Sequence, residues 1–136
     1  MNVLETEWWT MVLPPEWWAD AEADSILIGD RDEVGCIEIS TLRKSAGVFD
    51  SQELFQVAHS ESGSTAQWQD ASLGEFRGLT RQFREEDAAL REWYVALDQM
   101  MLYITYSCAL ENAGMDDAAV DELLDTLLPV NPGPSE

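Results

Sequence analysis

The chain has 136 residues, enough for one domain that buries roughly two-thirds of its unfolded surface. Its 46% hydrophobic and 25% charged residues are typical of a globular protein and exclude a disordered one. The 27 acidic and 7 basic residues give a net charge of −20, which repels nucleic-acid phosphates and anionic lipid. We therefore expect a protein partner, basic or hydrophobic, and expect neither nucleic-acid nor membrane binding.

The N-terminal region predicts one strand followed by an irregular segment. Glu7–Leu13 has the aromatic and β-branched residues of a strand. Pro14-Pro15 ends it, because proline cannot donate to a strand ladder. Glu16–Asp24 reads as a loop or a single helical turn carrying a second tryptophan pair.

An acidic hairpin is predicted next. Ser25–Gly29 and Cys36–Thr41 form its strands, and Asp30–Gly35 forms its polar turn. The turn resembles the start of a calcium loop, with acids at positions 1 and 3 and glycine at position 6. Val34 at position 5 and Thr41 at position 12 lack the required oxygen and bidentate carboxylate. A simple turn is the favoured interpretation.

A mid-chain helix is predicted over Ser51–Glu61. Asp50 and Glu53 have the spacing of a capping box, in which each side chain accepts from the other residue's backbone N–H. The segment Glu61–Thr65 ends the helix. The apolar residues expected to be buried are Leu54, Phe55, Val57 and Ala58.

The second half of the chain predicts antiparallel strands connected by short turns. Gln67–Leu73 and Phe76–Arg84 are strands, with a bulge or bend expected at Gly74 and Gly78. Glu85–Ala89 is expected to be a polar turn.

The densest apolar segment, Arg91–Cys108, predicts a central hairpin around which the fold is built. Asp98-Gln99 is its two-residue turn, since aspartate tolerates positive φ. Neither of its strands has a wholly polar face, so both faces are expected to be covered. Trp93 is a predicted core residue.

A C-terminal amphipathic helix is predicted over Asp116–Leu128, ended by Pro129. Residues 1–129 are expected to form one domain, with 130–136 a flexible tail. The predicted fold is α+β: an antiparallel sheet of about six or seven strands with the mid-chain and C-terminal helices packed on it. The residues of the apolar stripe of the last helix are Val120, Leu123, Leu124, Leu127 and Leu128.

This element order resembles the PsbP-like superfamily, which includes the photosystem II protein PsbP, a Ran-binding import factor, the DcrB lipoproteins and effector-associated chaperones of type VI secretion. Leu13-Pro14-Pro15-Glu16-Trp17 is similar to the family's leucine-proline-x-glycine-tryptophan opening, with Glu16 where glycine is usual. The likeness covers most of Trp8–Pro129. It implies a binding module or adaptor that is not an enzyme.

No catalytic, cofactor-binding or metal-binding constellation is predicted. His59 is the only histidine and has no nucleophile or orienting acid at a supporting spacing. Cys36 and Cys108 lie in apolar strand-like runs and are expected to be buried thiols, with a disulfide left open. The start, MNVLETEWWT, lacks a basic n-region and an apolar h-region, so a cytoplasmic protein is expected.

The predicted binding residues are two tryptophan pairs, Trp8-Trp9 and Trp17-Trp18, and the acids of the last helix. Adjacent strand residues point to opposite faces, so Trp8 and Trp9 cannot both enter one core. Exposed tryptophan is enriched at binding hot spots, although two covered faces would leave both rings structural. The acids are Asp117, Asp121, Glu122 and Asp125.

Three functions follow from these features, and the one ranked last is an enzyme or a small-ligand carrier built on the sheet. The first is a non-enzymatic protein-binding module, in its concrete form an adaptor or chaperone of a bacterial secretion system. The second is an acidic immunity protein or nucleic-acid mimic that neutralises a basic partner. Aromatic recognition should survive raised salt, whereas charge-steered association should not.

Overall fold

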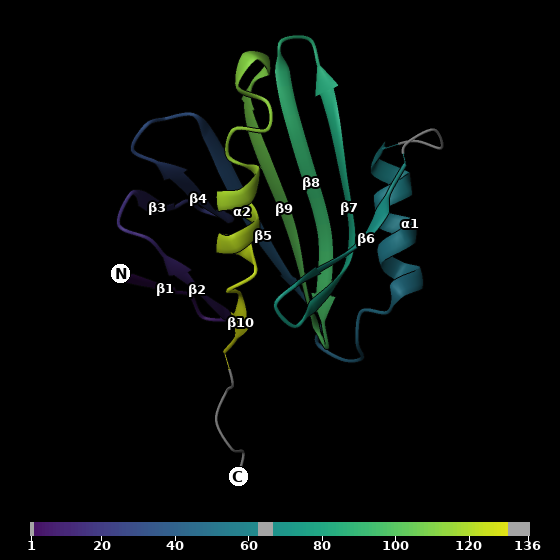
Figure 1. Ribbon diagram of the computed structural model, residues 1–136. Coiled ribbons are helices and arrows are strands. Elements are labelled where there is room, and N and C mark those ends of the chain that lie inside the picture. The colour runs from purple at the N-terminus through teal and green to yellow at the C-terminus, as the bar shows by residue number, and fades with distance from the viewer. Residues whose placement is uncertain (1, 63–66, 131–136) are drawn as a thin grey trace.

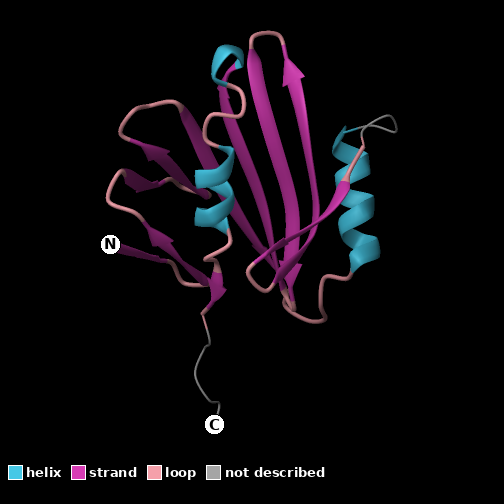
Figure 2. Ribbon diagram, viewed as in Figure 1, coloured by secondary structure: helices cyan, strands magenta, loops and turns pink. Residues whose placement is uncertain are grey.

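The computed structural model describes residues 2–62 and 67–130, which form two antiparallel sheets and two α-helices (Figures 1 and 2). The predicted tail at 130–136 lies outside the described residues, except for Val130. The α+β class and the mostly antiparallel sheet are confirmed.

The larger sheet has seven strands in the order β3-β4-β5-β9-β8-β7-β6, and every neighbouring pair is antiparallel. The smaller sheet has the order β1-β2-β10. In chain order the strands of the larger sheet are β3 (Trp17–Ala21), β4 (Ser25–Asp30), β5 (Gly35–Arg43), β6 (Gln69–Leu73), β7 (Phe76–Glu85), β8 (Ala88–Leu97) and β9 (Met100–Ala109). The strands of the smaller sheet are β1 (Asn2–Glu5), β2 (Trp9–Leu13) and β10 (Leu128–Pro129).

The central hairpin is confirmed. β8 and β9 occupy the middle of the larger sheet and pair from Ala88↔Ala109 to Leu97↔Met100. Asp98 in the two-residue turn has φ 55°, the left-handed conformation that aspartate tolerates. The turn between β7 and β8 also spans two residues, Glu86-Asp87, so the predicted turn over Glu85–Ala89 was too long.

Two apolar clusters lie on opposite faces of the larger sheet. One contains Trp93 and Val95 of β8 with the buried residues of β2 and of α2 (Asp117–Leu124). The other contains Tyr94 and Ala96 with Leu54 and Ala58 of α1 (Ser51–Ser62). Because side chains alternate along β8, the smaller sheet and α2 cover the inner face, and α1 covers part of the outer face (Figure 1).

The predicted capping box of α1 is confirmed. The Asp50 N–H donates to Glu53 Oε1 at 3.1 Å, and the Glu53 N–H donates to Asp50 Oδ1 at 2.8 Å. Phe55, however, is 54% exposed, so its predicted burial was wrong. Leu54 and Ala58 pack in the cluster between α1 and the sheet, and Phe55 is not part of that cluster.

Other predicted elements also differ. Glu16–Asp24 was expected to be irregular, but Trp17–Ala21 is a strand because it pairs with β4 along its whole length. The last helix ends at Leu124, and Leu128 is exposed in β10, where it pairs with Thr10 of β2. Gly78 pairs regularly with both neighbouring strands, so no bulge forms there, whereas Gly74 forms the β6–β7 turn with φ 60°.

Neither helix in the described part of the chain has the length and apolar character needed to cross a bilayer.

Candidate functional site

Each tryptophan pair is divided between the core and the surface. Trp9 and Trp17 are buried, whereas Trp8 is 39% and Trp18 is 42% exposed. The Trp9 indole N–H donates to Thr41 Oγ1 at 2.9 Å and so joins β2 to β5. Trp8 and Trp9 therefore do not both enter the core, but Trp8 lies in the bend before β2, so the strand predicted over Glu7–Leu13 began two residues too early.

The Trp18 ring lies on the outer face of the larger sheet, against Gly29 of β4. Trp18 is paired with Gly29, and a Cβ on this glycine would lie 2.5 Å from the ring. The indole N–H donates to the Asp30 carbonyl oxygen at 3.3 Å. A side chain at position 29 would therefore displace the ring, so Gly29 positions the exposed aromatic group.

The part of the outer face that surrounds Trp18 is here called the Trp18 face. It is formed by alternate residues of β3, β4, β5 and β9, which the register places side by side. Its members are Trp18, Asp20, Leu27, Gly29, Cys36, Glu38, Ser40, Thr105 and Ser107. These residues include two carboxylates and an aromatic ring but no basic side chain. The cluster that contains α1 lies over β7, β8 and the Met101 end of β9, leaving this face accessible.

Both hairpin turns that border the Trp18 face are acidic. Glu22 and Asp24 lie at the β3–β4 turn, and Asp32 and Glu33 lie at the β4–β5 turn beside Arg31. The Asp30 carboxylate accepts the Val34 N–H at 3.1 Å, which is the contact of an ordinary turn. The sequence segment that resembled a calcium loop therefore supplies an acidic border.

Trp8 lies elsewhere, with the guanidinium of Arg43 stacked over its ring at 4.1 Å. It borders a hollow of about 450 Å³ together with Pro129, Val130 and the β8–β9 turn. Arg43 ends β5, whereas Cys36, next to the Trp18–Gly29 pair, lies near its start. These positions are about 23 Å apart along an extended strand. The structure therefore does not bring Trp8 and Trp18 together into one surface.

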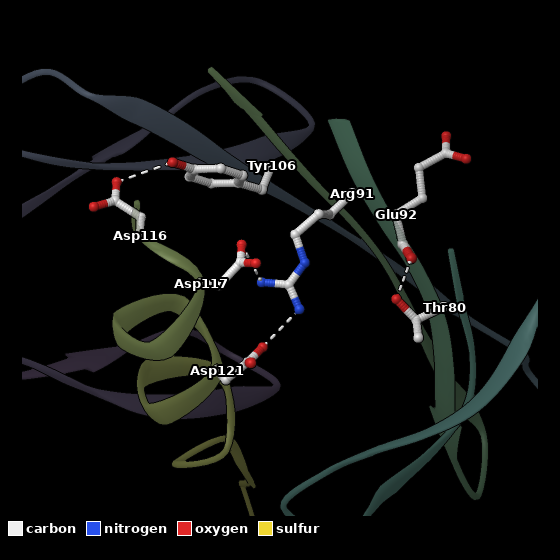
Figure 3. Close-up of polar contacts among 7 residues, drawn as sticks. All are labelled: Thr80, Arg91, Glu92, Tyr106, Asp116, Asp117 and Asp121. Atoms are coloured by element: carbon white, nitrogen blue, oxygen red, sulfur yellow. Dashed lines mark hydrogen bonds and ion pairs between the residues drawn. The ribbon is translucent and has the colours of Figure 1, made fainter. Parts of the chain in front are cut away.

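Most of the predicted acids of α2 make contacts within the protein (Figure 3). The Arg91 guanidinium, whose side chain is 13% exposed, pairs with Asp117 at 3.4 Å and with Asp121 at 2.7 Å. The Asp125 carboxylate accepts the Gly74 N–H at 3.0 Å. Glu122 is exposed. Three of the four carboxylates thus hold α2 and the β6–β7 turn in place.

Tyr106 also joins the larger sheet to the start of α2. Its hydroxyl donates to Asp116 at 2.9 Å (Figure 3). Burial, and then this hydrogen bond, raise the pKa of Tyr106. On the outer face, the Tyr103 hydroxyl donates to Glu92 at 2.5 Å, and Glu92 pairs with Arg81 at 2.7 Å.

The chain's three tyrosines, all on β8 and β9, should make stability fall at high pH. Burial raises the pKa of Tyr94 to about 12, above the value of about 10 for an unfolded chain. The folded state holds this proton more tightly, so the contribution is complete below about pH 10 and is lost as the pH rises toward 12. Urea unfolding at stepped alkaline pH should show this decline. Ordinary tyrosinate titration of all three residues in the folded protein would contradict it.

The histidine and the two cysteines of the chain are surrounded by packing contacts. His59 packs against Phe55 with ring centroids 4.1 Å apart. Cys36 and Cys108 are free thiols, and burial raises the pKa of Cys36, which reduces its thiolate fraction. Within residues 2–62 and 67–130, no group of three His, Cys, Asp or Glu side chains could hold a metal ion.

Sequence reasoning identified Trp18 but missed the surface around it. Glu38 and Cys36 alternate with the buried Ile37 and Ile39, a pattern that could have placed them on the outer face. Their position next to Trp18 depends on the pairing of β3 with β4, and the sequence pattern did not predict β3.

No protein-family model matches the chain, and no curated protein does. Among the solved structures that it matches is a crystal structure from Bacteroides thetaiotaomicron VPI-5482, with a TM-score of 0.68 and 17% sequence identity. The alignment covers 95% of this chain and 47% of the other, so this chain spans about half of that protein. This likeness shows a shared fold.

Proposed function

We propose that the chain is a non-enzymatic protein-binding module that takes a basic segment of another protein on the Trp18 face. The observation that carries this proposal is an exposed indole that rests on Gly29, within the Trp18 face, whose residues include two acids and no base. Tryptophan provides a large contact area at low conformational cost, and the carboxylates would favour a positively charged partner.

The size of the face sets the expected affinity. Across its four strands the Trp18 face spans three spacings of about 4.8 Å, and along the strands it spans about six residues of about 3.3 Å each. Its area is therefore roughly 300 Å². A standard interface takes about 800 Å² from each partner. The partner must therefore also contact the acidic turns, and we expect a transient complex of micromolar affinity.

An adaptor or chaperone role in bacterial secretion is the more specific form of this proposal, and it is supported only by the resemblance in element order. The alternative, a neutralising protein that binds through charge, is less well supported at α2. There Asp117, Asp121 and Asp125 are already used in contacts with Arg91 and Gly74.

Replacing Trp18 with alanine should weaken partner binding by about thirtyfold, the effect of a hot-spot residue worth about 2 kcal/mol. Partners would be captured from a lysate at low and high salt and identified, and each would then be titrated with purified variants. Trp8→Ala is the matched control, because its ring is similarly exposed but lies elsewhere.

The expected result is loss of affinity in Trp18→Ala, with Trp8→Ala unchanged and binding kept at high salt. Equal affinity of the wild type and Trp18→Ala would overturn the Trp18 face as the site. Binding that disappears at high salt in every variant would instead favour the neutralising function. Capture of no protein at either salt concentration would contradict both the binding-module and the neutralising function.

A further inference from the structure

A groove lies between α1 and the β6–β7 edge of the larger sheet, away from the Trp18 face. Its volume is about 680 Å³, within the range of roughly 300–1,000 Å³ typical of small-molecule sites. α1, β6, β7 and β8 all contribute to its walls, and the apolar lining residues are Phe49, Leu54, Phe55, Ala71, Leu79 and Ala96.

Phe55 is the feature that makes this groove unusual. The helical spacing places Phe55 next to Leu54 in the apolar part of α1, yet it is 54% exposed at the groove. The apolar surface of the helix is therefore wider than its contact with the sheet. An apolar molecule lying in the groove would cover the remainder.

Arg77 adds a charge to this apolar groove. Lys44, Arg81 and Arg91 each pair with a carboxylate, but among residues 2–62 and 67–130 the Arg77 guanidinium has no ion pair or hydrogen bond. Arg77 is paired with Ser72 on one side and Ala96 on the other, and all three residues line the groove, where Arg77 is exposed.

The charges indicate how a ligand would lie. The Phe49 N–H bonds the Asp98 carbonyl oxygen at 2.8 Å, which places the start of α1 at the same end of the strands as Arg77 and Ala96. Asp70 also lines the groove, but its partner in the β6–β7 pairing is Leu79, two residues beyond Arg77 along β7. An anionic group is therefore attracted to the Arg77 end and repelled from the Asp70 end.

We propose that this groove binds a small apolar carboxylic acid, with the carboxylate on Arg77 and the chain against Phe55, Leu54 and Leu79. Arginine suits this position because its planar guanidinium can donate two hydrogen bonds to one carboxylate. The site is separate from the Trp18 face, so it can hold or fail independently of the protein-binding function.

Octanoate and 1-octanol are the probes, since they share a chain and differ in the head group. Each would be titrated into the isotopically labelled full chain, with the amide signals of Ala71, Gly78 and Ala96 followed by NMR. Octanoate should give saturable shifts confined to the groove and bind about tenfold more tightly than octanol. Equal affinity of the two probes, or no saturable shift with octanoate, would overturn the proposal.

Two arginine variants test the role of the charge. Arg77→Gln should weaken octanoate binding about tenfold and leave octanol unchanged. Arg84→Gln is the matched control, because Arg84 is an exposed arginine on the same strand but on the opposite face. A loss in both variants would indicate general charge attraction and would overturn the specific contact. Phe55→Ala, which removes an exposed ring, should weaken both probes.

Discussion

Replacing Trp93 with alanine is expected to lower the free energy of unfolding by about 3–5 kcal/mol, a large part of the stability of a domain this size. The ring is 2% exposed and lies in the inner cluster between β8 and α2. Arg91 stacks on it at 4.6 Å while also pairing with the acids of α2. Truncation therefore leaves a cavity and loosens the contact that positions the helix.

Urea unfolding followed by circular dichroism would measure this loss. Trp8→Ala is the control, since its exposed ring should contribute about 1 kcal/mol or less. A loss below about 1 kcal/mol in Trp93→Ala would contradict the position of this ring in the core.

Replacing Gly78 with alanine should destabilise the protein by about 3 kcal/mol. A Cβ at this position would overlap the carbonyl oxygen of Tyr94 on β8 and lie 2.8 Å from the Val95 Cα. These are backbone atoms of a neighbouring strand and cannot rotate away. The β7–β8 ladder would therefore have to separate locally.

Gly47→Ala is the control for the Gly78 substitution. Gly47 has φ 81° with no atom within 4 Å of an added Cβ, so only the cost of a positive φ, about 1 kcal/mol, should appear. The free energies of unfolding of both variants would be compared with that of the wild type. A smaller loss in Gly78→Ala than in Gly47→Ala would contradict the close approach of β7 and β8.

The features predicted well depend on neighbours in the sequence. The capping box of Asp50 and Glu53 spans one helical turn, and the Asp98-Gln99 turn joins adjacent strands. The apolar stripe was correct for Val120, Leu123 and Leu124 within the helix, and Leu127 is buried just beyond its end. Such patterns are visible because their spacing reflects local backbone geometry.

The features that were missed depend on partners far away in the sequence. Trp17–Ala21 contains two alanines and an aspartate, residues depleted in strands, and it becomes a strand because it pairs with β4. Leu128 continues the helical spacing but pairs with Thr10 instead, more than 110 residues away in the chain. Tertiary pairing overrides local preference in both segments.

The two tryptophan pairs show what the local sequence determined and what depended on the tertiary structure. Alternation along a strand is a property of the local backbone, and inside β3 it places Trp17 in the core and Trp18 at the surface. Trp8 and Trp9 are divided as the sequence predicted, but Trp8 lies in the bend before β2. Only the tertiary structure decided that Trp18 would rest on Gly29 while Trp8 would lie near the far end of β5. The strand order sets these two positions. That order follows from the burial of apolar faces, to which residues far apart along the chain contribute.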